Sequence, residues 1–215
     1  FSEIGLERTA FLHVADMAIA THSPTASQTT VNQLPPIETQ LFDGQTVLVQ
    51  VIKDPIGTKG ARLSTKISIA GRLLVYLPKE EGIGVTQKVD SDEERMALKN
   101  QMIELLGDHP DGGYIIRTAA LDAAVEEWQN DINYLKRTWQ EINEQKRKRS
   151  APTLIHRDLT LAQRVLRDMV TQDTQSVICD NADTLQQLQA FAQTYMPSVL
   201  PRLKLAPVER PLFDT

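Results

Sequence analysis

The sequence predicts an α+β protein, in which short strands dominate the first third and helices become frequent after it. Between residues 46 and 78, β-branched runs separated by glycine and proline turns are typical of a small barrel or sandwich. Apolar residues recur at helical spacing over 122–148, which predicts one long amphipathic helix. Helices then alternate with a strand, so we place a domain boundary near residue 160.

The predicted strands lie mainly in the first half of the chain. Residues 1–19 have the composition of strand material, and the stretch from Thr21 to Pro36, rich in Thr, Ser, Gln and Pro, is typical of a long surface loop. A shorter loop is expected at 54–60, which holds two glycines and a proline. Alternation and turn residues predict strands at 46–52, 63–69, 73–77, 83–89 and 114–118.

The helices are predicted from capping and periodicity. Ser91 followed by Glu94 forms a capping box that opens a helix to about Leu106. In the 122–148 helix, apolar residues stand at 121, 125, 128, 132, 135, 139 and 142, which predicts a continuous seam packed on a core. Helices at 159–170 and 182–195 with a strand at 177–179 between them complete the prediction.

Length and composition exclude several classes of protein. The 215 residues, 41% hydrophobic and 24% charged, are typical of one large or two small globular domains rather than a disordered chain. No apolar run is long enough for a membrane span. The single cysteine, Cys179, excludes an internal disulfide framework and a Cys-rich metal site within these residues, and fits a cytoplasmic location. Because the chain opens on Phe1 rather than Met and stops at Thr215 without an obvious terminal element, we expect a fragment or a trimmed chain.

Charge is distributed very unevenly along the chain, although its net value is −5. Residues 45–79 carry six basic residues and one acidic residue, Asp54, whereas 80–131 carry thirteen acidic and four basic residues. Residues 132–149 are basic again, with six basic and two acidic residues. A basic segment on an acidic protein is typical of a surface that holds a polyanion. The alternative is a solvated strand face with no ligand.

Two groups of residues are candidates for binding RNA or DNA. Phe1 and Phe11, with Lys53 and Lys59, have the chemistry with which small barrels stack bases and neutralise phosphates. The alternative is that both phenylalanines fill the barrel. The second group is Arg117 with Thr118, because a guanidinium beside a hydroxyl suits a terminal phosphate. The alternative is an ordinary surface arginine.

Other kinds of chemistry lack support in the sequence. The four histidines have no spacing typical of metal ligands, so we predict no metal site. There is no Walker-type phosphate loop, and no catalytic set of side chains can be picked out, so we assign no catalytic residue.

Several segments together resemble the ribonuclease E/G family, in the family's order and at close to its spacing. They cover nearly the whole chain except the loop at 21–40: KDPIGTKGARLST at 53–65, SIAGRLLVYLP at 68–78, GVTQKV at 84–89, IRTAA at 116–120, YLKRTW at 134–139 and LAQRVLRD at 161–168.

The resemblance implies a fold in three parts. Residues 1–66 would be an OB-fold RNA-binding domain, an incomplete β-barrel that lacks its first strand. Residues 67–160 would be a mixed α/β 5′-sensor domain, and 161–215 the start of an RNase H-like α/β domain. It also implies a bacterial endoribonuclease that cuts single-stranded RNA, is stimulated by a 5′-monophosphate end and acts in rRNA processing and mRNA decay.

The resemblance further assigns residues to roles. Phe1, Phe11, Lys53 and Lys59 match the family's RNA-contacting positions. The 5′-phosphate pocket is matched by Arg117, Thr118, Gly71 and the Val75 backbone, while Lys88 and Arg62 are further possible RNA contacts.

Two departures bear on that pocket. The segment 121–124 has no glycine where the family often carries a glycine-bearing loop, and Gln87 replaces an arginine of some members, which leaves any contact there to Lys88.

The catalytic part of such an enzyme is expected beyond residue 215. The parent would be a metal-dependent, homo-oligomeric hydrolase that uses Mg²⁺ and carries Zn²⁺, whereas this chain alone would hold neither cofactor and would not cleave RNA. The rival interpretation is a non-enzymatic OB-fold module that binds RNA or protein without sensing an RNA end.

Overall fold

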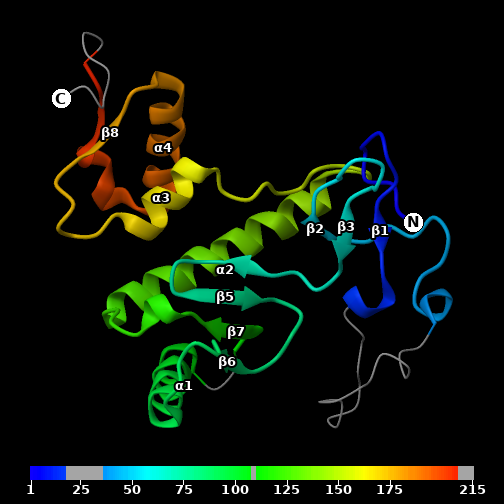
Figure 1. Ribbon diagram of the computed structural model, residues 1–215, viewed down its shortest axis with the longest axis horizontal. Helices are drawn as coiled ribbons and strands as arrows, with labels where there is room; N and C mark the ends of the chain where they lie inside the picture. Colours follow the sequence, from blue (N-terminus) through cyan, green and yellow to red (C-terminus); the bar gives the residue numbers. More distant parts are fainter. Residues whose placement is uncertain (18–35, 108–109, 208–215) are drawn as a thin grey trace. The chain divides into compact units, whose positions relative to one another are not determined.

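The computed structural model describes residues 1–17, 36–107 and 110–207 (Figure 1). These residues form an α+β structure with three separate sheets, as the sequence predicts for the class. The chain divides into two compact units, Phe1–His156 and Arg157–Thr215. The loop expected from Thr21 to Pro36 lies, apart from Pro36, outside the described residues.

The first sheet has three strands in the order β1-β3-β2. They are β1 (Phe11–Leu12), β2 (Gln50–Lys53) and β3 (Arg62–Ser64), with β1 parallel and β2 antiparallel to β3. Ala10, Leu12 and Leu63 form the core beneath this sheet together with Met17 and Ala61. Within the part of the chain that the structure describes, these strands do not close into a barrel.

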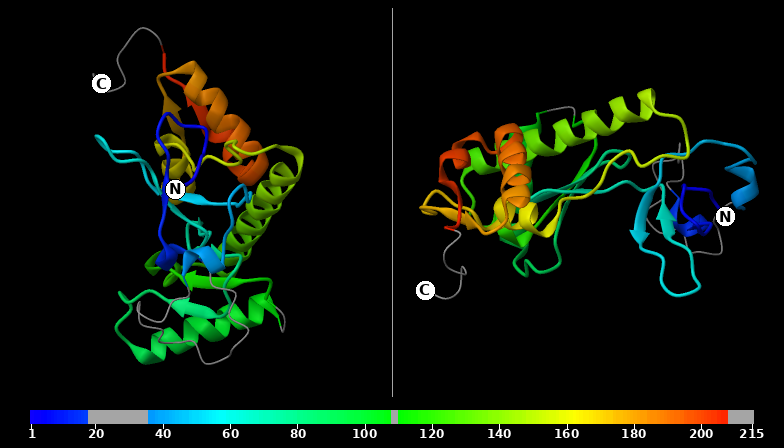
Figure 2. Two further views of the ribbon diagram at one scale, coloured as in Figure 1. Left: turned by 90° about the vertical axis from the view of Figure 1, so that its right-hand side faces the viewer. Right: turned by 90° about the horizontal axis from the view of Figure 1, so that it is seen from above.

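A glycine allows the close approach of β1 to the chain before β3. A Cβ atom on Gly60 would lie 1.9 Å from the carbonyl oxygen of Thr9. No side chain fits there, so the two segments meet through backbone alone, which brings Phe11 beside Arg62 in the register. The β2–β3 connection, drawn in cyan in Figure 2, extends away from the sheet.

Three predicted strands in this region are wrong in extent. Of the stretch 1–19, the described residues 1–17 form no strand beyond the two-residue β1 and one bridge between Ser2 and Ala10, because a turn with a positive φ at Gly5 reverses the chain. The 46–52 strand begins at Gln50. The 63–69 strand is broken after Ser64, since the Gln50 side chain bonds both the backbone N–H and the carbonyl of Ser68 in place of a neighbouring strand.

The second sheet has four strands in the order β4-β5-β7-β6. They are β4 (Ile69–Ala70), β5 (Leu74–Leu77), β6 (Ile83–Val85) and β7 (Gly113–Ile116); β6 and β7 are parallel, and the other pairs are antiparallel. Leu74, Tyr76, Tyr114 and Ile116 are buried on one face because alternate residues of a strand point the same way.

Two helices contribute to the core on that buried face. The helix α1 (Asp92–Leu106) begins where predicted, with the Ser91 hydroxyl accepting from the backbone N–H of Glu94. Helix α2 (Val125–Lys148) is confirmed from Val125 onward, and Figure 1 shows it running along the sheet. Its seam is buried at 128, 132, 135 and 142 but exposed at 121 and 125, so the seam is shorter than predicted.

The second unit contains α3 (Leu161–Met169), β8 (Val177–Cys179), α4 (Ala182–Tyr195) and β9 (Leu203–Leu205). The first three were predicted, whereas β9, which pairs in parallel with β8, was not. Among the described residues, no helix is long and apolar enough to cross a membrane.

Candidate nucleic-acid interface

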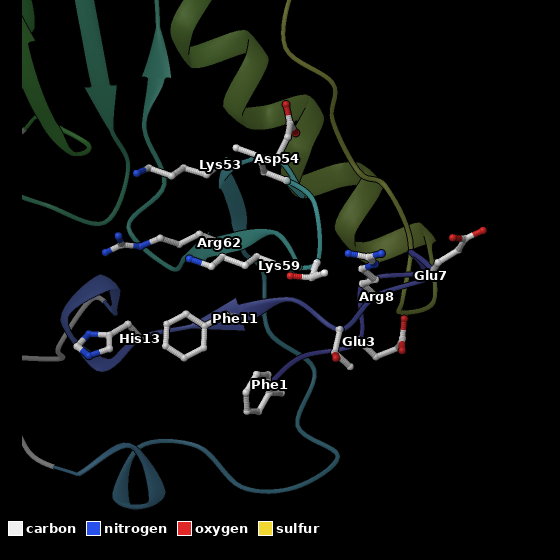
Figure 3. Close-up of a pocket in the computed structure, with 14 residues that line it drawn as sticks. Phe1, Glu3, Glu7, Arg8, Phe11, His13, Lys53, Asp54, Lys59 and Arg62 are labelled. Carbon is white, nitrogen blue, oxygen red and sulfur yellow. The ribbon is translucent and has the colours of Figure 1, made fainter.

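A cavity of about 1140 Å³ lies on the first sheet and gathers residues from two segments of the chain, 1–13 and 53–62 (Figure 3). Phe1, Phe11, Lys53, Lys59 and Arg62 all line it. Each of these residues is a predicted RNA contact, and the structure brings all five together around one cavity.

One wall of the cavity is a row of aromatic rings. The ring centroids of Phe1 and Phe11 are 5.9 Å apart, and those of Phe11 and His13 are 6.0 Å apart. Phe1 is 94% exposed and Phe11 41% exposed, so the alternative that they fill the core does not hold. Phe11 faces outward because its neighbour Leu12 points into the core, and its backbone N–H bonds the carbonyl of Ala61.

His13 is a part of this row that sequence reasoning missed. It stands two residues after Phe11, and in an extended chain residues i and i+2 share a face. That spacing was the available signal. The His13 Nδ1 atom accepts from the backbone N–H of Ala15 at 3.2 Å, which orients the exposed ring.

Three basic side chains line the same cavity from β2, β3 and the loop between them. Lys53 and Lys59 make no side-chain ion pair or hydrogen bond with any described residue, so their charges face solvent. Arg62 differs, since its Nη2 and Nε atoms lie 2.8 and 2.9 Å from a carboxylate oxygen of Asp16. In Figure 3 Glu3 and Glu7 lie at the far end of the cavity, beside Arg8.

The loop that carries Lys59 is held by its own backbone and by Arg8. Ile56 and Lys59 exchange two backbone hydrogen bonds of 3.2 and 3.0 Å, which close a tight turn around Gly57, where φ is +57°. The Arg8 guanidinium donates to the carbonyl of Gly57. These contacts hold the lysine toward the cavity without neutralising it.

The residues predicted to bind the 5′-phosphate lie on the second sheet, away from this cavity. Arg117 directly follows β7 and is half-buried, and its Nη1 atom donates to the carbonyls of Gly71 and Arg72 at 2.5 and 3.1 Å. Its Nε and Nη2 atoms have no partner among the described residues, and no described carboxylate pairs with it. The guanidinium is therefore oriented, but its charge is not neutralised.

The other predicted members of this group lie around the same end of the sheet. Thr118 is exposed and begins a 3₁₀ turn, whereas Gly71 is buried in the turn between β4 and β5. Val75 is half-buried in β5, in register with Ala70 on one side and Ile115 on the other.

Lys88 follows β6 and lies at the same end of the sheet as Arg117. It is exposed in a turn after β6, and the parallel pairing of β6 with β7 puts the residues that follow both strands at the same end of the sheet. Arg95 of α1 donates to the carbonyls of Val85, Thr86 and Val89 and so fixes that turn.

The residues with shifted pKa values belong neither to the cavity of the first sheet nor to the group around Arg117. Burial, reinforced by the Asp111 carboxylate, raises the pKa of Tyr76 to about 12 and that of Tyr114 further still. Burial, followed by the nearby charge of Lys146, lowers the pKa of Lys79. In the described part of the chain, no cluster of three or more His, Cys, Asp or Glu side chains could hold a metal ion.

Comparison with known proteins decides the family. The model of the "Ribonuclease E/G family" matches residues 68–215. The chain belongs to this family. It is 36% identical over its whole length to Ribonuclease G of Haemophilus influenzae and to Ribonuclease G of Escherichia coli K12, of which it covers 43%. It is 34% identical to Ribonuclease E of Haemophilus influenzae and covers 22% of that protein. The chain thus spans less than half the length of these ribonucleases.

Proposed function

We propose that this chain is the RNA-binding and 5′-end-sensing region of an endoribonuclease that cuts single-stranded RNA in RNA processing and decay. The observation that carries the proposal is the cavity on the first sheet, where exposed rings and cations face one ligand space. Family membership supports RNA as the ligand, since the relatives are ribonucleases by name.

The chemistry of the cavity suits a single strand with little sequence preference. Unpaired bases can stack on Phe1 and Phe11, each contributing ~1–3 kcal/mol, because every base has a π face. Lys53 and Lys59 would neutralise the phosphates between these bases. A duplex could not use the rings in this way, because its bases already stack on each other.

The group around Arg117 suits the 5′ end of the same RNA. A monophosphate carries nearly two negative charges at neutral pH, and the donors of Arg117 that remain available can bind its oxygens as a fork. The exposed Thr118 hydroxyl supplies a further donor beside it. A 5′-hydroxyl end would offer these donors no charge, so the site would favour the monophosphate.

Cleavage is assigned to the rest of the protein. We propose that the full-length enzyme is homo-oligomeric and hydrolyses RNA with a divalent metal, Mg²⁺, and that it also carries Zn²⁺. Among the described residues, no cluster of three or more His, Cys, Asp or Glu side chains could hold such an ion. We expect the chain to bind RNA, and we expect its incubation with RNA in Mg²⁺-containing buffer to yield no cleavage products.

Matched oligonucleotides test the proposal. Binding of an A/U-rich RNA with a 5′-monophosphate, triphosphate or hydroxyl end is measured by fluorescence anisotropy. We expect the monophosphate to bind about tenfold or more tightly than the hydroxyl, because hydrogen bonds to a charged group contribute ~1.5–3 kcal/mol. Arg117→Ala should abolish the difference, whereas Lys99→Ala, which removes an exposed charge on α1, should preserve it.

The other outcomes separate the alternatives. Equal affinity for all three ends would leave a general single-strand binding region and contradict end sensing. An absence of RNA binding by the folded chain would support the rival module that binds protein.

A further inference from the structure

We propose that Asp131, a residue of α2 to which no role has been given so far, is a positioning residue for the 5′-phosphate site. The inference rests on the proposed function of Arg117. Asp131 does not reach the phosphate; it acts through the turn between β4 and β5, to which both its own carboxylate and the Arg117 guanidinium are bonded.

The Asp131 carboxylate accepts hydrogen bonds from three consecutive backbone N–H groups. Oδ1 lies 2.8 Å from the nitrogen of Arg72, and Oδ2 lies 2.9 Å from the nitrogens of Leu73 and Leu74. Asp131 is 7% exposed. A buried charge is costly unless it is compensated, and successive N–H groups form a concavity that binds anions. The turn therefore has a defined anion at its centre, supplied by the protein itself.

Gly71 makes room for this arrangement. A Cβ atom on Gly71 would lie 2.4 and 2.5 Å from the two carboxylate oxygens of Asp131. No other residue can occupy position 71 while the carboxylate stays in place. The glycine at the wall of the predicted phosphate site is thus explained by a side chain that stands 60 residues later in the sequence.

The same turn orients the guanidinium from its other side. The carbonyls of Gly71 and Arg72 accept from Nη1 of Arg117, and the carbonyl of Leu73 accepts from the Arg117 backbone N–H at 2.9 Å. The N–H groups of the turn thus bind Asp131, while its carbonyl groups bind Arg117. If the carboxylate no longer held the N–H groups, the carbonyls would lose their fixed direction and Arg117 would lose its orientation.

The variant Asp131→Asn tests this chain of contacts. An amide has one accepting oxygen, and its NH₂ group would face a backbone N–H, so the three bonds cannot all persist. We expect the preference for 5′-monophosphate over 5′-hydroxyl RNA to fall about tenfold, toward none, since it would lose the bonds of one oriented charged donor. Affinity for the 5′-hydroxyl RNA, which depends on the first sheet, should stay within about twofold.

Thr138→Val is the matched control. Thr138 is also buried on α2, and its hydroxyl donates to the Tyr134 carbonyl at 2.9 Å, with no bond to the turn. Its loss should lower stability but leave the end preference intact. If Asp131 were merely structural, Asp131→Asn would behave like Thr138→Val, lowering the unfolding temperature without changing the preference of the folded protein.

A second route covers the case in which Asp131→Asn does not fold. Gly71→Ala displaces the carboxylate sterically and should also remove the preference for 5′-monophosphate RNA. Once Asp131→Ala has removed the carboxylate, adding Gly71→Ala should lower this preference little further. Folded variants at both positions that retain the wild-type preference would overturn the inference and leave the proposed function intact. A wild-type chain without any end preference would instead refute the proposed function, and this inference with it.

Discussion

Replacing Lys59 with alanine should reduce the salt dependence of RNA binding by a predictable amount. Each phosphate that a protein cation neutralises on a single strand contributes about −0.7 to the slope of log Kobs against log salt. The Lys59 side chain makes no ion pair or hydrogen bond with any described residue, so its removal should flatten the slope by about 0.7, and Lys53→Ala with Lys59→Ala by about 1.4. Between about 50 and about 200 mM salt the double variant would lose roughly sevenfold less affinity than wild type.

Arg62 provides the internal comparison. Its guanidinium already lies 2.8 Å from the Asp16 carboxylate, so it releases fewer counterions when RNA binds. Arg62→Ala should therefore change the slope less than Lys59→Ala, although both remove one positive charge from the same cavity. Anisotropy titrations at four or so salt concentrations give the slopes. Equal changes in slope for Arg62→Ala and Lys59→Ala, or no change for the lysine variants, would refute the proposal that Lys53 and Lys59 neutralise the RNA phosphates.

Three further outcomes are expected. Phe11→Ala should weaken RNA binding by ~1–3 kcal/mol without a change in the salt slope, and an unchanged dissociation constant would contradict base stacking. Leu135→Ala should lower the free energy of unfolding in urea by ~2–5 kcal/mol because Leu135 is fully buried, whereas Val125→Ala, 53% exposed, should change it by less than about 0.5 kcal/mol. Between pH 10 and about 12 the folded state should retain protons on Tyr76 and Tyr114 that the unfolded state has lost, so stability present below pH 10 should fall as pH rises through this window. Phenolate absorbance of all four tyrosines near pH 10 would contradict that burial.

Local signals in the sequence predicted a substantial part of the fold. The Ser91 cap and the apolar spacing of α2 were informative because capping and periodicity are properties of neighbouring residues. The strand extents at 1–19 and 63–69 were wrong, since they depend on partners. Whether Ser68 continues a strand is decided by the side chain of Gln50, which competes for its backbone.

The candidate site was likewise predictable where it depends on residue type and unpredictable where it depends on distant contacts. Aromatic and basic residue types were sufficient to single out Phe1, Phe11 and Lys59, but only the fold shows that they line one cavity. His13 was missed because the histidines were considered as metal ligands and not as aromatic rings that stack on bases. The contact between Asp131 and the β4–β5 turn could not be predicted, because no local pattern connects a polar residue on a helix with three N–H groups about 58 residues earlier.

Photo-crosslinking maps most directly where the RNA lies. A short single-stranded RNA with a photoreactive uracil is bound to the wild-type chain and irradiated, and the crosslinked peptides are identified by mass spectrometry. If bases stack on the aromatic wall, the crosslinks should fall on Phe1, Phe11 and His13 and should be lost in excess unlabelled RNA. Specific crosslinks confined to other surfaces, with none on these three residues, would contradict RNA binding in the cavity of the first sheet.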